Sequence, residues 1–290
     1  MITRFAPSPT GHLHLGHVVN AIVVWDRARA AGGVVRLRIE DHDRERSRSE
    51  FERSILDDLD WLGFVPDVPA IDAFRAGPCG GRQSDHPQRY EVALATLARA
   101  GLVYGCGCSR ADIARRAATL SPDGAVTIGD PQRPESELRY DNFCRDRGLT
   151  PGRGAGTRVR IDPGIEEFED LMLGRQRQEP SAQCGDLLVR DRLGLWTYQF
   201  AVVVDDVAEQ ITDVIRGGDL LTSTGRQIRL ARLLGRPQPP RFLHHPLIVD
   251  AAGQKLSKAR GDTGISALRR AGMGPADVID RARRMAGLHA

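Results

Sequence analysis

The N-terminal third of the chain alternates between strand-like and helix-like patterns, and this alternation strongly limits the folds open to it. Residues 2–6 predict a short strand, and residues 34–40 alternate apolar and charged side chains as a second strand does. Between them, residues 15–31 predict a long helix that ends at two glycines. Further helices are predicted over 46–62 and 87–100. Strands that alternate with helices favour an α/β domain with a parallel sheet.

The rest of the chain interrupts this pattern and then resumes it. Residues 106–190 contain many Pro, Gly and Arg residues and little periodicity, so we expect an inserted subdomain. Residues 1–105 and 191–290 are then the two halves of one nucleotide-binding α/β domain. The other elements expected are a loop over 120–137, a buried parallel strand over 198–206, a helix over 222–235, a short strand over 247–249, and helices over 265–271 and 275–286.

The composition excludes several classes of protein. The chain is 41% hydrophobic and 27% charged, which is typical of a globular protein. It contains no apolar run of about 18 residues, as an ordinary transmembrane helix would need. The N-terminus has no basic start followed by an apolar stretch, so we expect a cytoplasmic protein without a secretory signal or membrane association. The net charge of +3 does not by itself predict nucleic-acid binding.

The lysines are unusual in number and position. Lys and Arg total 41, yet only Lys255 and Lys258 are lysine. Both lie in a short segment that contains Gly253 and ends in Ala259. A lysine ammonium is a compact charge on a flexible stem, unlike the planar fork of arginine. Two ammonium groups on one loop are suited to closing over a triphosphate and stabilising charge that develops on its oxygens.

A second candidate phosphate site lies near the N-terminus. The segment over residues 6–17 joins the first strand to the first helix through a turn rich in Pro and Gly. His14 and His17 share one face of the first helical turn, and Gly16 leaves room for a flat ring. Free N–H groups and the positive end of the helix dipole favour phosphate there. A metal-binding pair and two surface histidines are the alternatives.

Together, the two motifs resemble those of class I aminoacyl-tRNA synthetases. His14-Leu15-Gly16-His17 is similar to the "HIGH" motif, and Lys255-Leu256-Ser257-Lys258 to the "KMSKS" motif. Four further segments resemble the glutamyl-tRNA synthetase branch of this class. They are Arg4-Phe5-Ala6-Pro7-Ser8-Pro9-Thr10-Gly11, Arg38-Ile39-Glu40-Asp41, residues 198–206, and Val214-Ile215-Arg216-Gly217-Gly218-Asp219. The resemblance implies a Rossmann-like catalytic domain with an inserted subdomain.

The length of the chain narrows the choice of family that it resembles. About thirty residues follow Lys258, so we expect no helical anticodon-binding domain. Stand-alone catalytic domains of this kind resemble the glutamyl-queuosine tRNA(Asp) synthetase family. That resemblance implies activation of glutamate by ATP without tRNA, and then esterification of queuosine at the wobble position of tRNA(Asp). We expect a monomer.

The resemblance also implies roles for individual residues. For the adenylation reaction that it implies, we assign His14, His17 and Lys258 to the transition state, with Mg²⁺ as a charge partner and Lys255 assisting loop closure. ATP is bound by His14, Gly16, His17 and Lys258. The implied glutamate pocket consists of Arg4, Phe5, Ala6, Pro7, Ser8, Glu40, Tyr198 and Arg216. Arg4 and Arg216 bind the side-chain carboxylate, and Glu40 binds the ammonium group. Ala259 replaces the serine that usually ends the second motif, and we expect a modest effect.

Three of the five cysteines form a candidate metal site. Cys106 and Cys108 have the spacing C-x-C, and Cys144 follows Tyr140 by four residues. Such a set is suited to tetrahedral Zn²⁺, and the glutamyl-queuosine family carries a similar C-x-C…Y-x-x-x-C zinc site. The resemblance therefore implies one structural zinc held by Cys106, Cys108, Tyr140 and Cys144. Reduced thiols without metal are the alternative.

Other functions remain open at this point. The chain is alternatively a catalytic fragment or paralogue of a glutamyl-tRNA synthetase that charges tRNA 3′ ends. A third reading is a regulatory paralogue that binds an adenylate or RNA without chemistry, although both histidines and both lysines are present. A fourth is another adenylyl-transferring enzyme, against which Arg4, Glu40 and Arg216 argue.

Overall fold

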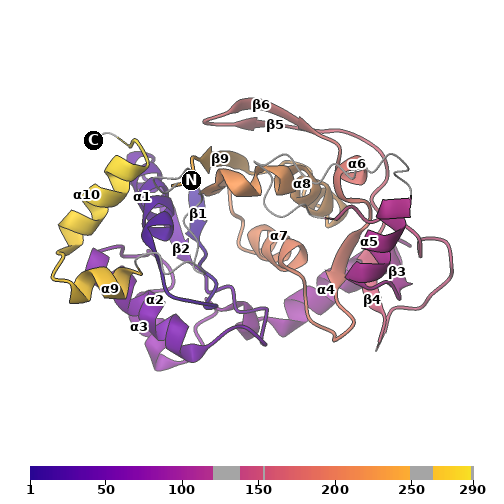
Figure 1. The fold of residues 1–290 in the computed structure, drawn as a ribbon, viewed down its shortest axis with the longest axis horizontal. Helices are drawn as coiled ribbons and strands as arrows, with labels where there is room; N and C mark the ends of the chain where they lie inside the picture. The colour runs from indigo at the N-terminus through magenta and orange to yellow at the C-terminus, as the bar shows by residue number, and fades with distance from the viewer. Residues whose placement is uncertain (120–137, 153, 249–263, 289–290) are drawn as a thin grey trace.

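The computed structural model describes residues 1–119, 138–152, 154–248 and 264–288, so the loop expected over 120–137 lies outside the described residues. The N-terminal pattern folds as predicted. Strands β1 and β2 pair in parallel, with Arg4 opposite Arg36, and α1 crosses over between them. The first elements are β1 (Ile2–Phe5), α1 (Leu15–Ala30), β2 (Val34–Leu37), α2 (Ser49–Leu62), α3 (Ile71–Ala76) and α4 (Pro87–Arg99) (Figure 1).

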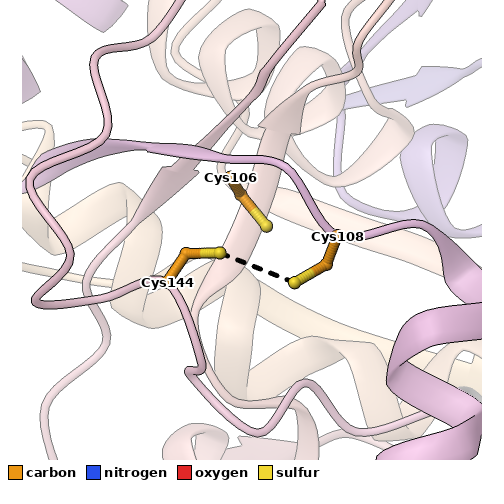
Figure 2. Close-up of side chains that lie close together, drawn as sticks. All are labelled: Cys106, Cys108 and Cys144. Atoms are coloured by element: carbon orange, nitrogen blue, oxygen red, sulfur yellow. Dashed lines mark hydrogen bonds between the residues drawn. The ribbon is translucent and has the colours of Figure 1, made fainter.

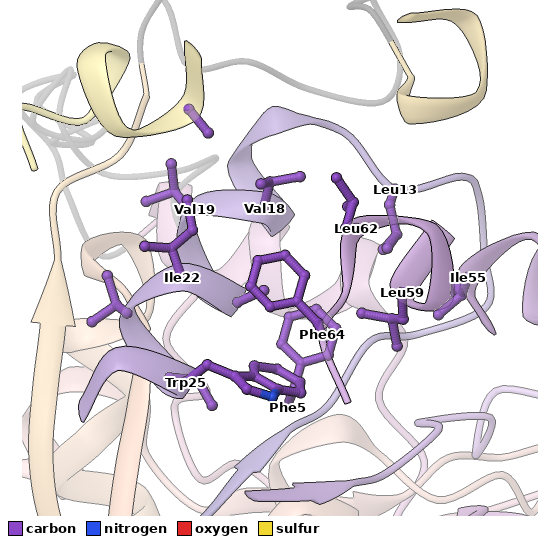
Figure 3. Close-up of a cluster of buried hydrophobic side chains, with 14 of the residues drawn as sticks. Phe5, Leu13, Val18, Val19, Ile22, Trp25, Ile55, Leu59, Leu62 and Phe64 are labelled. Atoms are coloured by element: carbon purple, nitrogen blue, oxygen red, sulfur yellow. The ribbon is translucent and has the colours of Figure 1, made fainter. Parts of the chain in front are cut away.

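A hydrophobic core lies between this βαβ unit and the helices beside it. Trp25 of α1 packs its ring on Phe5 and on Phe64, with centroids 5.6 and 5.2 Å apart. Leu59 and Leu62 of α2 face the same cluster (Figure 3). Truncating such a buried aromatic side chain costs about 3–5 kcal/mol. The core therefore fixes the C-terminal end of β1 against α1, and so fixes the turn between them.

The second half of the chain extends the sheet. Thr212 donates its backbone N–H to the carbonyl of Ile2 at 2.8 Å, which places β1 beside β8. Strands β8 (Asp213–Gly217) and β9 (Arg241–His245) pair in parallel, and the hairpin of β5 (Glu166–Asp170) and β6 (Gly174–Gln178) continues the order as β6-β5-β9-β8. The inserted subdomain expected over residues 106–190 stays a prediction. The β5–β6 hairpin lies within these residues, but β5 pairs with β9, which lies outside them.

A separate antiparallel sheet carries the cysteine segment. It has the order β3-β4-β7, with β3 (Val103–Cys106), β4 (Gly156–Val159) and β7 (Leu187–Arg190). The remaining helices are α5 (Arg110–Thr119), α6 (Pro180–Cys184), α7 (Tyr198–Ala208), α8 (Thr224–Leu233), α9 (Ile265–Arg270) and α10 (Pro275–Met285), with short 3₁₀ helices η1 (Gln83–Asp85) and η2 (Gly218–Ser223). The helices predicted over 222–235, 265–271 and 275–286 are confirmed. Among the described helices, none combines the length and apolar character needed to cross a lipid bilayer.

Two predicted strands were wrong. Residues 198–206 form most of helix α7, in which every residue from Phe200 to Asp206 is buried. A helix buried around most of its circumference shows no amphipathic period, and burial overrides the strand preference of its consecutive valines. Residues 247 and 248 form no strand. The strand in this part of the chain is β9, which ends before Pro246, because proline has no N–H to donate to a ladder. Val249 lies outside the described residues.

Candidate active site

The first turn of α1 holds the two histidines of the N-terminal motif. Nδ1 of His14 accepts a hydrogen bond from the backbone N–H of Gly16 at 3.1 Å, and the backbone N–H of His14 donates to Nδ1 of His17 at 3.1 Å. The two ring centroids are 4.0 Å apart. A Cβ atom on Gly16 would lie 2.9 Å from Cε1 of His14, so glycine is needed for this ring position. Both imidazoles therefore lie at the positive end of the α1 dipole.

A cavity of about 260 Å³ opens beside this turn. Its walls come from the C-terminal end of β1, the start of α1 and the C-terminal end of β8. Crevices at the carboxyl ends of parallel strands are the usual ligand sites of α/β proteins. The cavity brings together eight residues expected from the sequence, namely Arg4, Ala6, His14, Gly16, His17, Glu40, Tyr198 and Arg216.

Three residues expected in the glutamate pocket do not line this cavity. Phe5 points into the core against Trp25. Pro7 accepts the backbone N–H of Glu40 on its carbonyl at 3.0 Å, and the Ser8 hydroxyl donates to the carbonyl of Glu40 at 3.0 Å. Pro7 and Ser8 therefore hold the backbone at Glu40, while Phe5 anchors the strand.

A buried network of charges holds Arg4 and Glu40 in place. Oδ1 of Asp206 accepts hydrogen bonds from Nε of Arg4 at 3.0 Å and from Nη1 of Arg38 at 2.8 Å. Nη2 of Arg38 donates to Oε1 of Glu40 at 3.1 Å. Burial raises the pKa of Glu40. Burial opposes the charge of Asp206 as well, but Arg4 and Arg38 outweigh it and lower the pKa of that carboxyl group.

Arg216 has a different environment from Arg4. Its hydrogen bonds go to Nε2 of His244, Oε1 of Gln227 and Oγ1 of Thr224, and all three are neutral groups. Burial lowers the pKa of Arg216. Burial raises the pKa of Tyr198, so its phenol stays a neutral hydrogen-bonding group beside the guanidinium. This end of the cavity therefore presents a cation that is not hydrogen-bonded to a carboxylate within the described residues.

Lys255 and Lys258 lie outside the described residues, but the residues that flank them are described. Ile248 lines the cavity. Gly264 forms an antiparallel bridge with His14, and Ile265 donates its backbone N–H to the carbonyl of Leu13 at 3.0 Å. The chain thus leaves the cavity wall at one end of the lysine segment and returns to the histidine turn at the other.

Several buried polar side chains around this site were not predicted from the sequence. Arg38 lies on an alternating strand pattern and was given no role in the site, yet its side chain is only 2% exposed. Asp206 comes at the end of an apolar run, and this position in the sequence could have indicated a carboxylate at the end of a buried element. Asp170 and His244 are distant in the sequence, and β5 meets β9 only in the folded sheet.

The cysteine cluster forms at the edge of the antiparallel sheet. The Sγ atoms of Cys106, Cys108 and Cys144 all lie within 4.8 Å of one another and point toward one another (Figure 2). Tyr140 joins them, because its hydroxyl oxygen lies 3.3 Å from Sγ of Cys106 and accepts the backbone N–H of Cys144 at 2.9 Å. Nη2 of Arg116 donates to Sγ of Cys108 at 3.4 Å and partly opposes burial, which raises the pKa of that thiol to about 11. The fold therefore gathers all four expected ligands.

Comparisons with known proteins agree with this architecture. The family model for the catalytic domain of class I tRNA synthetases (E and Q) matches residues 1–288. Two solved structures share the fold. A glutamate tRNA ligase from Elizabethkingia meningosepticum, in complex with its amino acid, gives a TM-score of 0.70 at 29% identity over 90% of this chain, and the glutamate-tRNA synthetase from Elizabethkingia anophelis gives 0.71 at 29%. The chain spans about half the length of these two proteins, 52% and 53%. The chain therefore has the fold of a class I synthetase catalytic domain.

Curated relatives narrow the family. A protein of Bordetella bronchiseptica named glutamyl-Q tRNA(Asp) synthetase is 46% identical over 264 residues, which cover 90% of this chain and 75% of the relative. A protein of the same name from Rhodobacter capsulatus is 41% identical over 99% of this chain and 100% of its own length. The chain therefore belongs to the glutamyl-Q tRNA(Asp) synthetase family of class I synthetases.

Proposed function

We propose that this protein activates glutamate with ATP in the absence of tRNA and then transfers the glutamyl group to queuosine at the wobble position of tRNA(Asp). One observation carries the first step: a single cavity holds Arg216 and Glu40 together with His14 and His17. A guanidinium suits the side-chain carboxylate of glutamate, and a carboxylate suits its ammonium group. The names of the relatives supply the tRNA and the modified base.

The proposed chemistry needs no nucleophile from the protein. An oxygen of the glutamate α-carboxylate attacks the α-phosphorus of ATP in line, and the bond to the bridging oxygen breaks as pyrophosphate leaves. His14 and His17 hold the phosphates at the helix N-terminus, and Lys258 neutralises the charge that develops, with Lys255 assisting closure of their loop. Mg²⁺ accompanies ATP and supplies further positive charge. Orientation of two bound anions is the main contribution.

Specificity for glutamate follows from the charges of the cavity. Arg216 and Arg4 bind the side-chain carboxylate, and Tyr198 forms a hydrogen-bonding wall of the same cavity. The neutral amide of glutamine would leave a buried guanidinium without its partner, and sites of this kind discriminate by roughly 10⁴-fold or more. In the second step, a queuosine hydroxyl attacks the glutamyl carbonyl carbon, forms an ester and releases AMP.

The cysteine cluster fits one Zn²⁺ ion. Tetrahedral bonds of about 2.3 Å to sulfur place two thiolates about 3.8 Å apart. The Sγ atoms of Cys108 and Cys144 are 3.5 Å apart. Cys106, Cys108, Cys144 and Tyr140 would hold the ion and thereby join β3 to the segment around Tyr140. Because the cluster lies in a separate sheet from the cavity, its role is structural.

Pyrophosphate exchange tests the activation step. The protein is incubated with ATP, Mg²⁺ and labelled pyrophosphate, with glutamate, glutamine or no amino acid, and without RNA. We expect exchange with glutamate only. Absence of exchange under these conditions would favour a regulatory paralogue that binds without chemistry, and exchange with another amino acid would reveal a different adenylating enzyme.

The position of the glutamyl group tests the transfer step. Labelled glutamate is offered with tRNA(Asp) that carries queuosine, with the same tRNA lacking its 3′-terminal adenosine, with tRNA(Asp) that lacks queuosine, and with tRNA(Glu). We expect labelling of the first two only. Labelling that needs the terminal adenosine would identify a synthetase fragment that charges 3′ ends. These substrates favour a cytoplasmic protein, and we propose that it acts as a monomer.

A further inference from the structure

Arg216 is held by an unusual set of partners on the cavity floor. Its side chain is buried, and its Nε, Nη1 and Nη2 atoms donate to His244, Gln227 and Thr224 at 3.1, 2.6 and 2.8 Å. A buried guanidinium normally pairs with a carboxylate, because an uncompensated charge is costly to bury. Arg4, on the neighbouring strand, does pair directly with Asp206. The two arginines of the cavity therefore differ in how much of their charge is already neutralised.

A carboxylate does lie behind Arg216, but one imidazole away. Nδ1 of His244 lies 2.6 Å from Oδ2 of Asp170, and neither side chain is exposed. Asp170 also accepts the backbone N–H groups of His244, Met172 and Leu173 at 3.1, 3.0 and 2.9 Å. Three residues, from the turn after β5 and from β9, thus surround this carboxylate with four donors, which keeps it ionised.

The carboxylate determines which nitrogen of His244 carries the proton. An ionised carboxylate only accepts hydrogen bonds, so Nδ1 of His244 must be the N–H nitrogen. The lone pair of Nε2 is then available to Nε–H of Arg216 and to the hydroxyl of Thr224, which lies 3.1 Å away. Burial and the charge of Arg216 lower the pKa of His244 to about 4, so the ring is neutral at pH 7. A neutral acceptor orients the guanidinium without cancelling its charge.

We propose that Asp170 and His244 are positioning residues that orient Arg216 through the neutral imidazole and leave its charge available to the side-chain carboxylate of glutamate. This inference rests on the proposed function. Direct contact between Asp170 and Arg216 would occupy the fork that the substrate needs. The imidazole spacer separates the two charges while it fixes the direction of the guanidinium. Discrimination against glutamine thus depends on a residue of the β5–β6 hairpin that does not line the cavity.

The kinetic test uses three variants of this relay and one control. In Asp170→Asn and His244→Leu, the orientation of Arg216 is lost, so the KM for glutamate in pyrophosphate exchange should rise about tenfold or more while the KM for ATP is unchanged. The preference for glutamate over glutamine should fall as the KM for glutamate rises. His244→Gln places an amide oxygen near the position of Nε2 and should restore much of the wild-type KM.

Asp186→Asn is the matched control, because Asp186 is a buried carboxylate that accepts a backbone N–H and directly precedes β7 of the antiparallel sheet. It should lower thermal stability without raising the KM for glutamate. Folded Asp170→Asn and His244→Leu variants with the wild-type KM and the wild-type preference for glutamate would overturn the proposal.

A second measurement does not depend on glutamate or on any variant being active. ¹⁵N NMR of the imidazole nitrogens at pH 7, with His244 assigned by comparison with His244→Gln, should show a neutral ring protonated on Nδ1. A ring protonated on Nε2, or a charged ring, would contradict the relay. If the wild type shows this tautomer but no exchange with glutamate, the proposed function fails while the geometry stands.

Discussion

Arg38 and Glu40 form an ion pair of 3.1 Å in which the two side chains are 2% and 7% exposed. The same guanidinium contacts Asp206 at 2.8 Å and Glu209 at 3.0 Å. One arginine thus compensates three carboxylates beneath the cavity. Arg38→Met should therefore lower the free energy of unfolding by about 3–5 kcal/mol, because it leaves buried charges without a partner.

Chemical denaturation measures this loss, and Arg75→Met is the control. Arg75 also contacts three carboxylates, but it lies on the surface with 37% of its side chain exposed. Exposed ion pairs contribute about 0–1 kcal/mol. Equal effects of the two substitutions would show that the buried network does not stabilise the fold in the way described.

Glu40→Gln should weaken glutamate binding while the fold is retained. The substitution keeps the shape of the side chain but removes the charge that faces the ammonium group, so the KM for glutamate should rise about 10-fold to 100-fold. Pyrophosphate exchange at varied glutamate concentrations measures this KM. Glu52→Gln removes a carboxylate that pairs with Arg82 outside the cavity, and its KM should match the wild type. An unchanged KM in Glu40→Gln would remove this residue from the ammonium site.

Asp58 should make stability depend on pH in an unusual direction. Its side chain is buried on α2, Oδ2 has no hydrogen-bond partner among the described residues, and burial raises its pKa to about 7. The folded state therefore binds a proton that the unfolded state has released, so stability is full below about pH 4 and declines as the pH rises to about 7. The decline should be at most about 4 kcal/mol.

Denaturation of the wild type and Asp58→Asn at pH 5 and pH 8 checks this prediction. The variant should lose this part of the pH dependence and be the more stable of the two at pH 8. Asp72→Asn, at an exposed position that does not contribute to the pKa of Asp58, should behave as the wild type does. A wild type that becomes more stable between pH 5 and pH 8, with Asp58→Asn changing in parallel, would contradict the predicted role of Asp58.

The purified protein should contain about one zinc ion per chain, and Cys106→Ser should release it. Loss of the ion should also lower the thermal stability of the protein, because the proposed metal would join β3 to the segment around Tyr140. Cys184→Ser is the control, since this buried thiol contacts backbone carbonyls rather than the cluster. Elemental analysis measures the content, and wild-type protein free of zinc after growth in zinc would end the metal assignment.

Lys258→Ala should reduce the rate of pyrophosphate exchange by about 10²-fold or more, because it removes a charge that we propose acts on the transition state. The KM for glutamate should change little. Arg260→Ala removes a different cation from the same stretch of sequence and should retain most of the activity. Similar rates in Lys258→Ala and the wild type would exclude Lys258 from the chemical step.

The local elements that carry the histidine motif could be predicted because their signals are local. The turn before α1 is marked by Pro7, Pro9 and Gly11, and the helix after it by apolar spacing, so β1, α1 and β2 are all confirmed. Helix α7 was not predictable in the same way. Its burial on most sides removed the periodic signal, and its valines are typical of strands.

By itself, the sequence determined which residues carry charge, which positions need glycine, and which segments form the βαβ unit, because spacing and backbone preference act over a few residues. Only the tertiary structure decided how each charge is used. The pairing of β5 with β9 brings Asp170 to His244 across 74 positions, and α7 brings Asp206 to Arg4 across 202. Two arginines that look alike in the sequence therefore differ in the fold, since one is neutralised by a carboxylate and the other is held by neutral acceptors.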